Sequence, residues 1–214
     1  MEEFITILND ETAEIVEKKS KFIANLIHVE TTEEAESKIK EIKKKYHDAR
    51  HNCVAYRVAE NGKIVEKSSD DGEPSGTAGG PMLNILQKNN LCNLVVIVTR
   101  YFGGILLGTG GLVRAYSDAT QLAIEKSTKV TKVKGIEIQI NLDYANLEFF
   151  KYYCKNNDIN IKKIDYSENV ILKIEMEENR KTIFLNDIET KKLNVQHFQL
   201  IEEKYINKTV EKNK

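Results

Sequence analysis

Glycine and proline are concentrated in one segment of this 214-residue chain. Nine of the eleven glycines and both prolines lie between Gly72 and Gly111, and the remaining sequence is almost free of residues that break helices and strands. Glycine adopts backbone conformations that other residues avoid, and it lets the main chain approach a ligand closely. We therefore expect a site in this segment, although two tight loops around a buried strand would also explain it.

The charge balance and the hydrophobic content exclude several classes of protein. Lys and Arg number 32 against 33 Asp and Glu, and 41% of the residues are hydrophobic. A strongly basic nucleic-acid-binding tail and a disordered acidic chain are thereby excluded. No apolar run approaches the roughly 20 residues of a membrane span, and the acidic start Met1-Glu2-Glu3-Phe4 is unlike a signal peptide. We expect a cytoplasmic protein without a membrane contact.

Hydrophobic periodicity predicts alternating strands and helices up to residue 126. A helix is expected to begin at Thr31 or Thr32, with Glu34 or Glu36 completing its cap. The polar stretch Lys126–Lys134 has no periodicity and is interpreted as a linker. The other predicted elements are strands at Glu11–Val16, Lys21–Val29, Asn52–Ala59, Lys63–Ser68 and Leu94–Val98, and helices at Pro81–Lys88 and Leu112–Lys126.

From Ile136 onward the predicted order is strand, helix, strand, strand, helix, strand, which is the ferredoxin-like βαββαβ arrangement. Asp143 is expected to cap the first of these helices. The charged tail Asn207–Lys214 is expected to fray. The sequence thus predicts an α+β fold with two domains, at residues 1–130 and 131–214.

Acidic residues are absent from Pro74 to Ser117, whereas Lys88, Arg100 and Arg114 lie in this stretch. Its second glycine loop, residues 103–111, runs from a predicted buried strand into a predicted helix. Unpaired N–H groups and the dipole at a helix N-terminus favour phosphate, and the two arginines would add charge-assisted bonds. We interpret the loop as an anion or phosphate site. Alternatively, the glycines only shape a tight crossover and the arginines form salt bridges elsewhere.

The first glycine loop, residues 70–80, combines the carboxylates of Asp70, Asp71 and Glu73 with the hydroxyls of Ser75 and Thr77. Such carboxylates can bind Mg²⁺ or transfer protons, but Asp-Asp-Gly is also an ordinary turn. Ser75 or Thr77 would then cap the helix that follows.

Histidines, cysteines and lysines outside the loops suggest less chemistry. His51 is expected to form hydrogen bonds near the glycine loops, and no metal or cofactor is predicted. The basic segment Lys18-Lys19-Ser20-Lys21 has two interpretations, a contact with a phosphate backbone or a solvated turn. We favour the solvated turn. Without a recognisable aromatic pair, any contact with nucleic acid would rest on charge and shape, not on stacking.

Five sequence strings resemble the IMPACT/YigZ family. They are KKSKFIA (18–24), ARHNCVAYR (49–57), DDGEPSGTA (70–78), PML (81–83) and VTRYFGGILLGTGGLVRAY (98–116). The C-terminal half is similar to the small domain of bacterial YigZ-type members in length and element order only.

The resemblance implies a fold, a role and a marked surface. The N-terminal domain would resemble domain IV of elongation factor G, with a ribosomal-protein fold and a left-handed βαβ crossover, and the C-terminal domain would resemble domain V. Eukaryotic members regulate translation, and association with RNA or the ribosome is the usual proposal for bacterial members. The family motif marks these residues: Arg100, Tyr101, Gly103, Gly104, Gly108, Gly110, Gly111 and Arg114.

The sequence therefore predicts a non-catalytic RNA- or ribosome-associated protein that binds phosphate backbone through the second glycine loop, with Ser75, Thr77 and His51 nearby. One alternative is an enzyme for a small phosphorylated or nucleotide ligand, which requires the three carboxylates of the first loop to converge in a closed pocket. The other is a protein-interaction module, which requires an exposed apolar patch around Tyr101, Phe102, Ile105 and Leu106; these residues could instead anchor the loop in the core.

Overall fold

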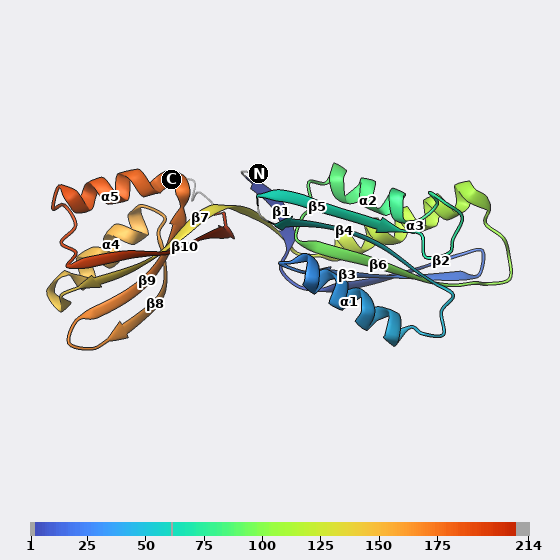
Figure 1. Cartoon of the computed structure of the whole chain (residues 1–214), viewed down its shortest axis with the longest axis horizontal. Coiled ribbons are helices and arrows are strands. Elements are labelled where there is room, and N and C mark those ends of the chain that lie inside the picture. Colours follow the sequence, from blue (N-terminus) through green and yellow to red (C-terminus); the bar gives the residue numbers. More distant parts are fainter. Residues whose placement is uncertain (1–2, 61, 209–214) are drawn as a thin grey trace. The chain divides into compact units, whose positions relative to one another are not determined.

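The chain forms two compact units in the computed structural model, which describes residues 3–60 and 62–208 (Figure 1). The first unit extends to Val130 and the second begins at Thr131. The fold is mixed, with two sheets and, within the described ranges, five α-helices. The predicted hairpin residue Asn61 and most of the tail expected to fray, residues 209–214, lie outside the described residues.

The sheet of the first unit has the strand order β2-β3-β6-β4-β5. Every neighbouring pair is antiparallel, so β3 and β4, which flank β6, run parallel to each other and are joined through α1. The elements of this unit are β1 (Glu3–Ile7), β2 (Glu11–Glu17), β3 (Ser20–His28), α1 (Thr32–Lys45), β4 (His51–Glu60), β5 (Lys63–Ser69), α2 (Gly79–Lys88), β6 (Leu94–Tyr101) and α3 (Gly108–Lys126).

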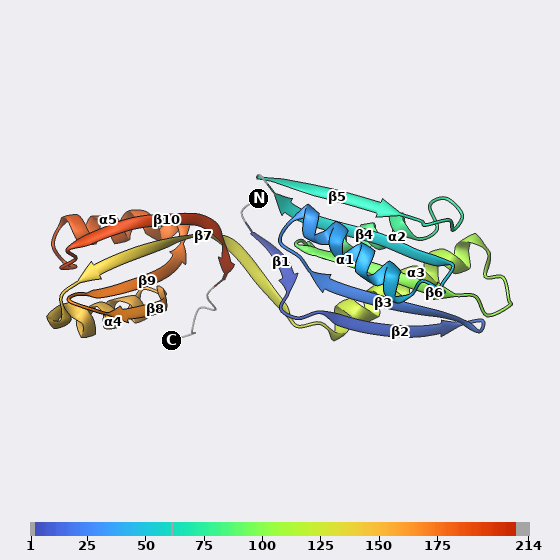
Figure 2. The ribbon, with the colours of Figure 1, turned by 60° about the horizontal axis from the view of Figure 1, so that its bottom comes forward.

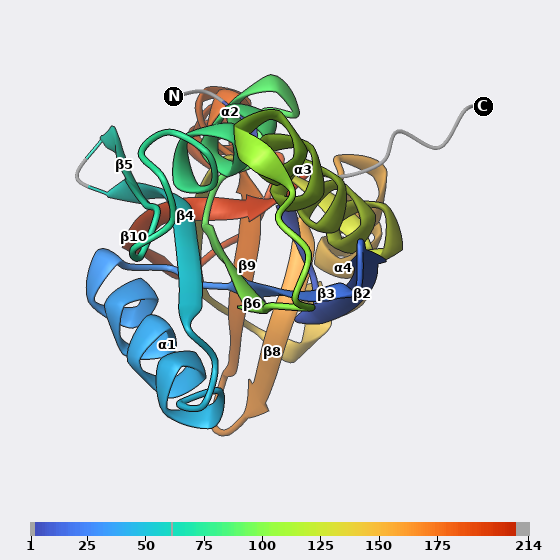
Figure 3. The same ribbon diagram turned by 90° about the vertical axis from the view of Figure 1, so that its right-hand side faces the viewer.

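Helices cover both faces of this sheet (Figures 2 and 3). On one face, α1 packs against a core that includes Val95 and Ile97 of β6. On the other, α2 and α3 pack against a core that includes Val96 and Val98. Because successive side chains of a strand alternate between faces, a strand buried on both faces reads as a continuous apolar run, as predicted for β6.

The predicted start of α1 is confirmed. Thr31 is the N-cap, and its Oγ1 accepts a hydrogen bond from the Glu34 backbone N–H at 3.1 Å. The Glu34 carboxylate in turn accepts the backbone N–H of Glu30 at 2.9 Å. The Glu34 N–H, which the helix itself leaves unpaired, is thus satisfied, and the N–H of Glu30, directly before the cap, is paired as well.

Two predictions about the segment around α3 were wrong. The helix begins at Gly108, four residues before the expected Leu112, because buried Leu107 and Leu112 pack the glycine-rich turn onto the core despite its low helix propensity. The expected linker 126–134 is largely strand, since β7 (Lys129–Leu142) begins inside it. Val133, a β-branched residue, is buried there and pairs with Ile206.

The second unit confirms the predicted βαββαβ order. Its strands lie in the order β10-β7-β9-β8, all antiparallel, as in the ferredoxin-like fold. Alternate residues of β7 and β9 share one core with both helices. The elements are β7, η1 (Tyr144–Asn146), α4 (Leu147–Asn156), β8 (Asn160–Tyr166), β9 (Val170–Glu177), η2 (Glu178–Arg180), α5 (Lys181–Glu189) and β10 (His197–Asn207).

Asp143 does not cap the helical segment that follows it, contrary to prediction. Its carboxylate instead accepts a hydrogen bond from the side-chain amide of Gln196 at 2.6 Å, so a distant segment takes the acceptor that a local pattern had assigned to the helix. Among the described residues, no helix combines the length and the apolar character that crossing a bilayer demands.

Replacing Thr31 with alanine tests the cap of α1. We expect T31A to lose about 1 kcal/mol of unfolding free energy, because the Glu34 N–H loses its side-chain acceptor. The measurement is urea unfolding, and S37A is the matched control, since Ser37 is exposed in the middle of the same helix. Equal unfolding midpoints for T31A and S37A would contradict the capping role.

Candidate functional site

Asp70 organises the first glycine loop. Its Oδ1 accepts the backbone N–H groups of Ala78 and Gly79 at 3.0 and 2.8 Å, and its Oδ2 accepts that of Gly76 at 2.8 Å. Burial alone would raise the pKa of Asp70, but these three donors outweigh it and hold the pKa below its ordinary value. The carboxylate therefore closes the loop onto the start of α2.

Ser75 and Thr77 do not cap α2, contrary to prediction. The N-cap residue is Ala78, whose side chain has no hydrogen-bond acceptor. The Thr77 hydroxyl is buried and donates to the Pro74 carbonyl at 2.6 Å, whereas Ser75 is exposed. The sequence interpretation looked for a hydroxyl directly before the helix, but the acceptor comes from Asp70 at the opposite end of the loop.

The other two carboxylates of this loop have different partners. Asp71 forms an ion pair with Lys43 at 2.6 Å and accepts the Asn52 backbone N–H at 2.7 Å. Glu73 enters the protein interior, where its Oε1 accepts from Arg100 at 2.7 Å and from the Tyr116 hydroxyl at 2.8 Å. The three acids thus do not converge on a common point, which argues against the enzyme hypothesis. Within the described ranges, no cluster of three or more His, Cys, Asp or Glu is arranged to hold a metal ion.

His51 lies against the first loop, as its expected role near the glycine loops requires. Its Nδ1 is 2.9 Å from the Asp71 carbonyl oxygen, and its Nε2 is 4.0 Å from Glu73 Oε1. Cys53, two residues along β4, has its Sγ 3.0 Å from the Asp70 carbonyl. Burial raises the pKa of that thiol to about 12, so it stays protonated and unreactive near neutral pH.

Arg100 is directed into the protein interior. Only 6% of the residue is exposed, and its charge is neutralised by Glu73. Its guanidinium carbon lies 5.5 Å from the ring centroids of both Phe22 and Phe102, while its Nε has no acceptor among the described residues. The strand alternation could have predicted this inward direction. Arg100 is an even number of residues from buried Val96 and Val98, so its side chain lies on the same face of β6, toward α3.

Tyr101, on the opposite face of β6 from Arg100, donates its hydroxyl to Asp48 at 2.7 Å. The loop then turns over the hairpin between β2 and β3. The Gly103 N–H donates to Ser20 Oγ at 3.1 Å, and a Cβ on Gly103 would lie 2.0 Å from the carbonyl carbon of Lys19. Only glycine permits this contact between the two backbones.

The contact brings the basic turn, Lys18 and Lys19, beside the second glycine loop, a juxtaposition that sequence reasoning missed. The two lysines are the central residues of a two-residue turn closed by the pair Glu17–Ser20, and their φ angles are +44° and +65°. Left-handed conformations at both positions are typical of a type I′ hairpin turn. No partner with opposite charge is found for either lysine among the described residues.

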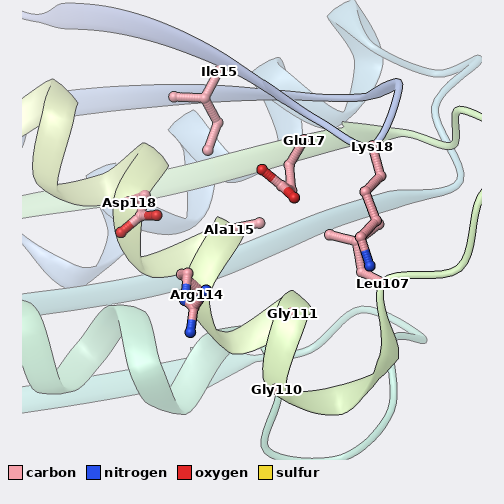
Figure 4. A pocket seen from close by; sticks show the side chains of 9 residues that line it. All are labelled: Ile15, Glu17, Lys18, Leu107, Gly110, Gly111, Arg114, Ala115 and Asp118. Carbon is pink, nitrogen blue, oxygen red and sulfur yellow. The ribbon is translucent and has the colours of Figure 1, made fainter.

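A pocket of about 270 Å³ lies between the basic turn and the first turns of α3 (Figure 4). Its apolar lining includes Ile15, Leu107 and Ala115, and Gly110 and Gly111 contribute backbone. No described side chain caps the N-terminus of α3, and a Cβ on Gly110 would meet no atom within 4 Å. Gly108, Thr109 and Gly110 are exposed, so main-chain N–H groups of this turn can be reached from solvent. Gly104 and Gly108, with φ of +84° and +72°, shape the approach to it.

Charges of both signs line this pocket. Arg114 and Lys18 face it together with Glu17 and Asp118, and none of the four forms an ion pair within the described part of the chain. The local charge is therefore balanced, in contrast to the acid-free stretch read from the sequence, because Glu17 and Asp118 lie outside that stretch. An anion would have to be held by directed contacts, not by a net positive field.

The second glycine loop and the residue directly before it also expose large apolar side chains. Phe102 is 53%, Ile105 43% and Leu106 82% exposed, whereas Leu107 is buried in the core. This segment is thus anchored through Leu107, whereas Phe102, Ile105 and Leu106 face solvent. The protein-interaction hypothesis requires exposure of these three residues and of Tyr101, which is half-buried.

Comparisons with known proteins identify the family. Residues 18–124 match the Impact N-terminal domain, and residues 140–189 match a domain of unknown function, DUF1949. IMPACT family member YvyE of Bacillus subtilis (strain 168) is 40% identical over 181 residues, which cover 85% of this chain and 83% of the relative. The chain belongs to the IMPACT family. The family prediction from the five strings is confirmed.

Two further similarities extend across most of the chain. IMPACT family member YigZ of Escherichia coli (strain K12) is 37% identical over 158 residues, covering 73% of this chain and 78% of the relative. A solved structure titled "Crystal structure of an hypothetical protein" is 32% identical, covers 94% of this chain and 98% of its own, and gives a TM-score of 0.63. Both glycine loops and the basic turn fall within the family domain at residues 18–124.

Removing the Glu73 carboxylate tests the buried ion pair. We expect E73Q to lose about 3–5 kcal/mol of unfolding free energy, because Arg100 would remain buried without a counter-charge. The double variant E73Q/R100M should lose clearly less, and D165N, which breaks the exposed pair with Lys163, should lose at most about 1 kcal/mol. Urea unfolding at pH 7 provides the measurement. A double variant as unstable as E73Q would contradict this account.

Asp70 should make stability depend on pH in a defined direction. Its folded-state pKa is lowered, so its contribution is complete above the unfolded pKa of about 3.9 and is lost as the pH falls through the folded value. We expect the stability difference between the wild type and D70N to shrink as the pH falls below about 4. Urea unfolding from pH 7 to pH 3 measures it, and a difference independent of pH would be inconsistent with the lowered pKa.

Proposed function

We propose that this chain is a non-catalytic RNA- or ribosome-associated protein, and that it binds phosphate backbone along a basic edge of its first unit. The basic edge consists of Lys18, Lys19, the second glycine loop and Arg114. The observation that carries the proposal is the packing of Gly103 on the β2–β3 hairpin. Two lysines without an ion-pair partner among residues 3–60 and 62–208 thereby lie beside a loop with accessible backbone donors.

The cations of the proposed site differ from those chosen from the sequence. Arg100 is committed to Glu73, so Arg114 is the arginine available for bidentate contact with a phosphate. Lys18 and Lys19 replace the missing charge. Since Glu17 and Asp118 face the same pocket, we expect few phosphate contacts and a correspondingly shallow salt dependence.

The link to translation comes from the family resemblance, in which eukaryotic members regulate translation. We extend it to this chain, together with the correspondence of its two units to domains IV and V of elongation factor G. The split connection β3-α1-β4 between parallel strands and the ferredoxin-like second unit support that correspondence. The left-handed crossover remains part of this proposal. The proposed correspondence to elongation factor G leads us to propose a ribosomal partner.

Exposed apolar side chains favour a second candidate function, contact with a partner protein. Leu106 is the most exposed of them, and a solvent-facing group of Phe102, Ile105 and Leu106 is larger than phosphate binding alone requires. A protein component of the ribosome would satisfy both candidate functions, whereas a partner unrelated to RNA would satisfy only this one.

Filter binding with ribosomes and with total RNA at two salt concentrations tests the main proposal. We expect the variant K18A/R114A to bind both more weakly at low salt, with a salt slope reduced by about one to two units because up to two phosphate contacts are lost. The matched control is K44A, since Lys44 is an exposed cation of α1 on the opposite face of the sheet. Unchanged affinity and slope for K18A/R114A would refute the phosphate site.

A further inference from the structure

The side chain of Phe102 is both exposed and supported from beneath. It follows the last residue of β6, and about half of its surface is open to solvent. The guanidinium carbon of Arg100 lies 5.5 Å from its ring centroid, within the range of a cation–π contact. An exposed phenylalanine ordinarily rotates among conformers, whereas this ring rests on a cation that is itself fixed.

Arg100 is suited to this support because its charge is already neutralised. The ion pair with Glu73, at 2.7 Å, and the buried ring of Phe22 hold the guanidinium in place. Its Nε has no acceptor in the described part of the chain, and its guanidinium carbon lies 5.5 Å from the ring centroids of both Phe22 and Phe102. The Phe102 ring is thus already ordered in the free protein, so binding a partner loses less side-chain entropy.

Cationic and apolar groups that could bind a nucleotide lie near the Phe102 ring. Gly103, the next residue, packs on the basic turn, so Lys18 and Lys19 lie nearby without ion-pair partners among the described residues. Ile105 and Leu106 expose apolar surface on the same loop. A partner that combines flat apolar groups with regularly spaced negative charge would complement both features.

We infer that the basic edge binds single-stranded RNA, with an unpaired base stacked on the outer face of Phe102. This inference rests on the proposed function, whose phosphate contacts it extends. Bases in a duplex are stacked on one another, so only a splayed or single-stranded base offers its face to an aromatic ring. The sequence had suggested contacts through charge and shape alone, because it contains no recognisable aromatic motif. The Phe102 ring is instead positioned by tertiary contacts, through Arg100 of β6 and Glu73 of the first glycine loop.

Fluorescence anisotropy with three labelled probes of equal phosphate number tests the inference: a 12-nucleotide oligouridylate, the same strand with abasic positions, and an RNA hairpin duplex. We expect the wild type to favour the oligouridylate. F102A should weaken that binding roughly tenfold, without changing the salt slope or the affinity for the abasic strand. F102W should restore it, and F149A, which removes a ring that is also 53% exposed in the second unit, should leave it unchanged.

Other outcomes separate this inference from the proposal beneath it. Equal wild-type binding of the base-bearing and abasic strands, with K18A/R114A still weaker, would overturn base stacking and retain the phosphate site. A loss for F102A that is the same with all three probes would assign Phe102 to loop shape and overturn the inference. If F102A weakens ribosome binding but not oligonucleotide binding, the ring contacts a ribosomal protein and the inference fails. Absence of binding to any probe or to ribosomes would refute both.

Discussion

The carboxylate of Glu73 joins three segments that are distant in the sequence. One of its oxygens accepts from Arg100 on β6 and from Tyr116 on α3, while Glu73 itself belongs to the first glycine loop. Both members of the ion pair are more than nine-tenths buried, so either one alone would be an uncompensated charge in a low-dielectric interior. The first glycine loop, the end of β6 and α3 therefore have a common point of attachment, and the ring of Phe102 depends on it through Arg100.

Much of the architecture could be read from the sequence. Periodicity located the strands and helices of both units except β1 (Glu3–Ile7), which was not predicted, and the order of elements after Ile136 was sufficient for the ferredoxin-like topology. Failures occurred where tertiary pairing overrides local pattern. The polar segment beginning at Lys126 contains the start of β7 because β10 pairs with it, and the carboxylate of Asp143 is taken by Gln196.

The candidate site was predictable in its location but not in its contacts. Glycine clustering pointed to the right loops, whereas the direction of a charged side chain depends on strand parity and on what lies across the sheet. Arg100 follows the parity of Val96 and Val98 into the core, and its partner Glu73 comes from a loop 27 residues earlier. The lysines that take its place beside the loop come from a hairpin 83 residues before Gly103, counted from Ser20. No local pattern relates these segments.

The lysine turn between β2 and β3 has an energetic consequence of its own. Asn-Gly would adopt the two left-handed conformations readily, whereas a lysine in that region costs on the order of 1–3 kcal/mol. The hairpin thus gives up intrinsic backbone stability to display two ammonium groups at its apex. Turn geometry and turn charge can therefore be varied separately. Replacing Lys18-Lys19 with Asn-Gly would stabilise the hairpin backbone and remove both positive charges from its apex.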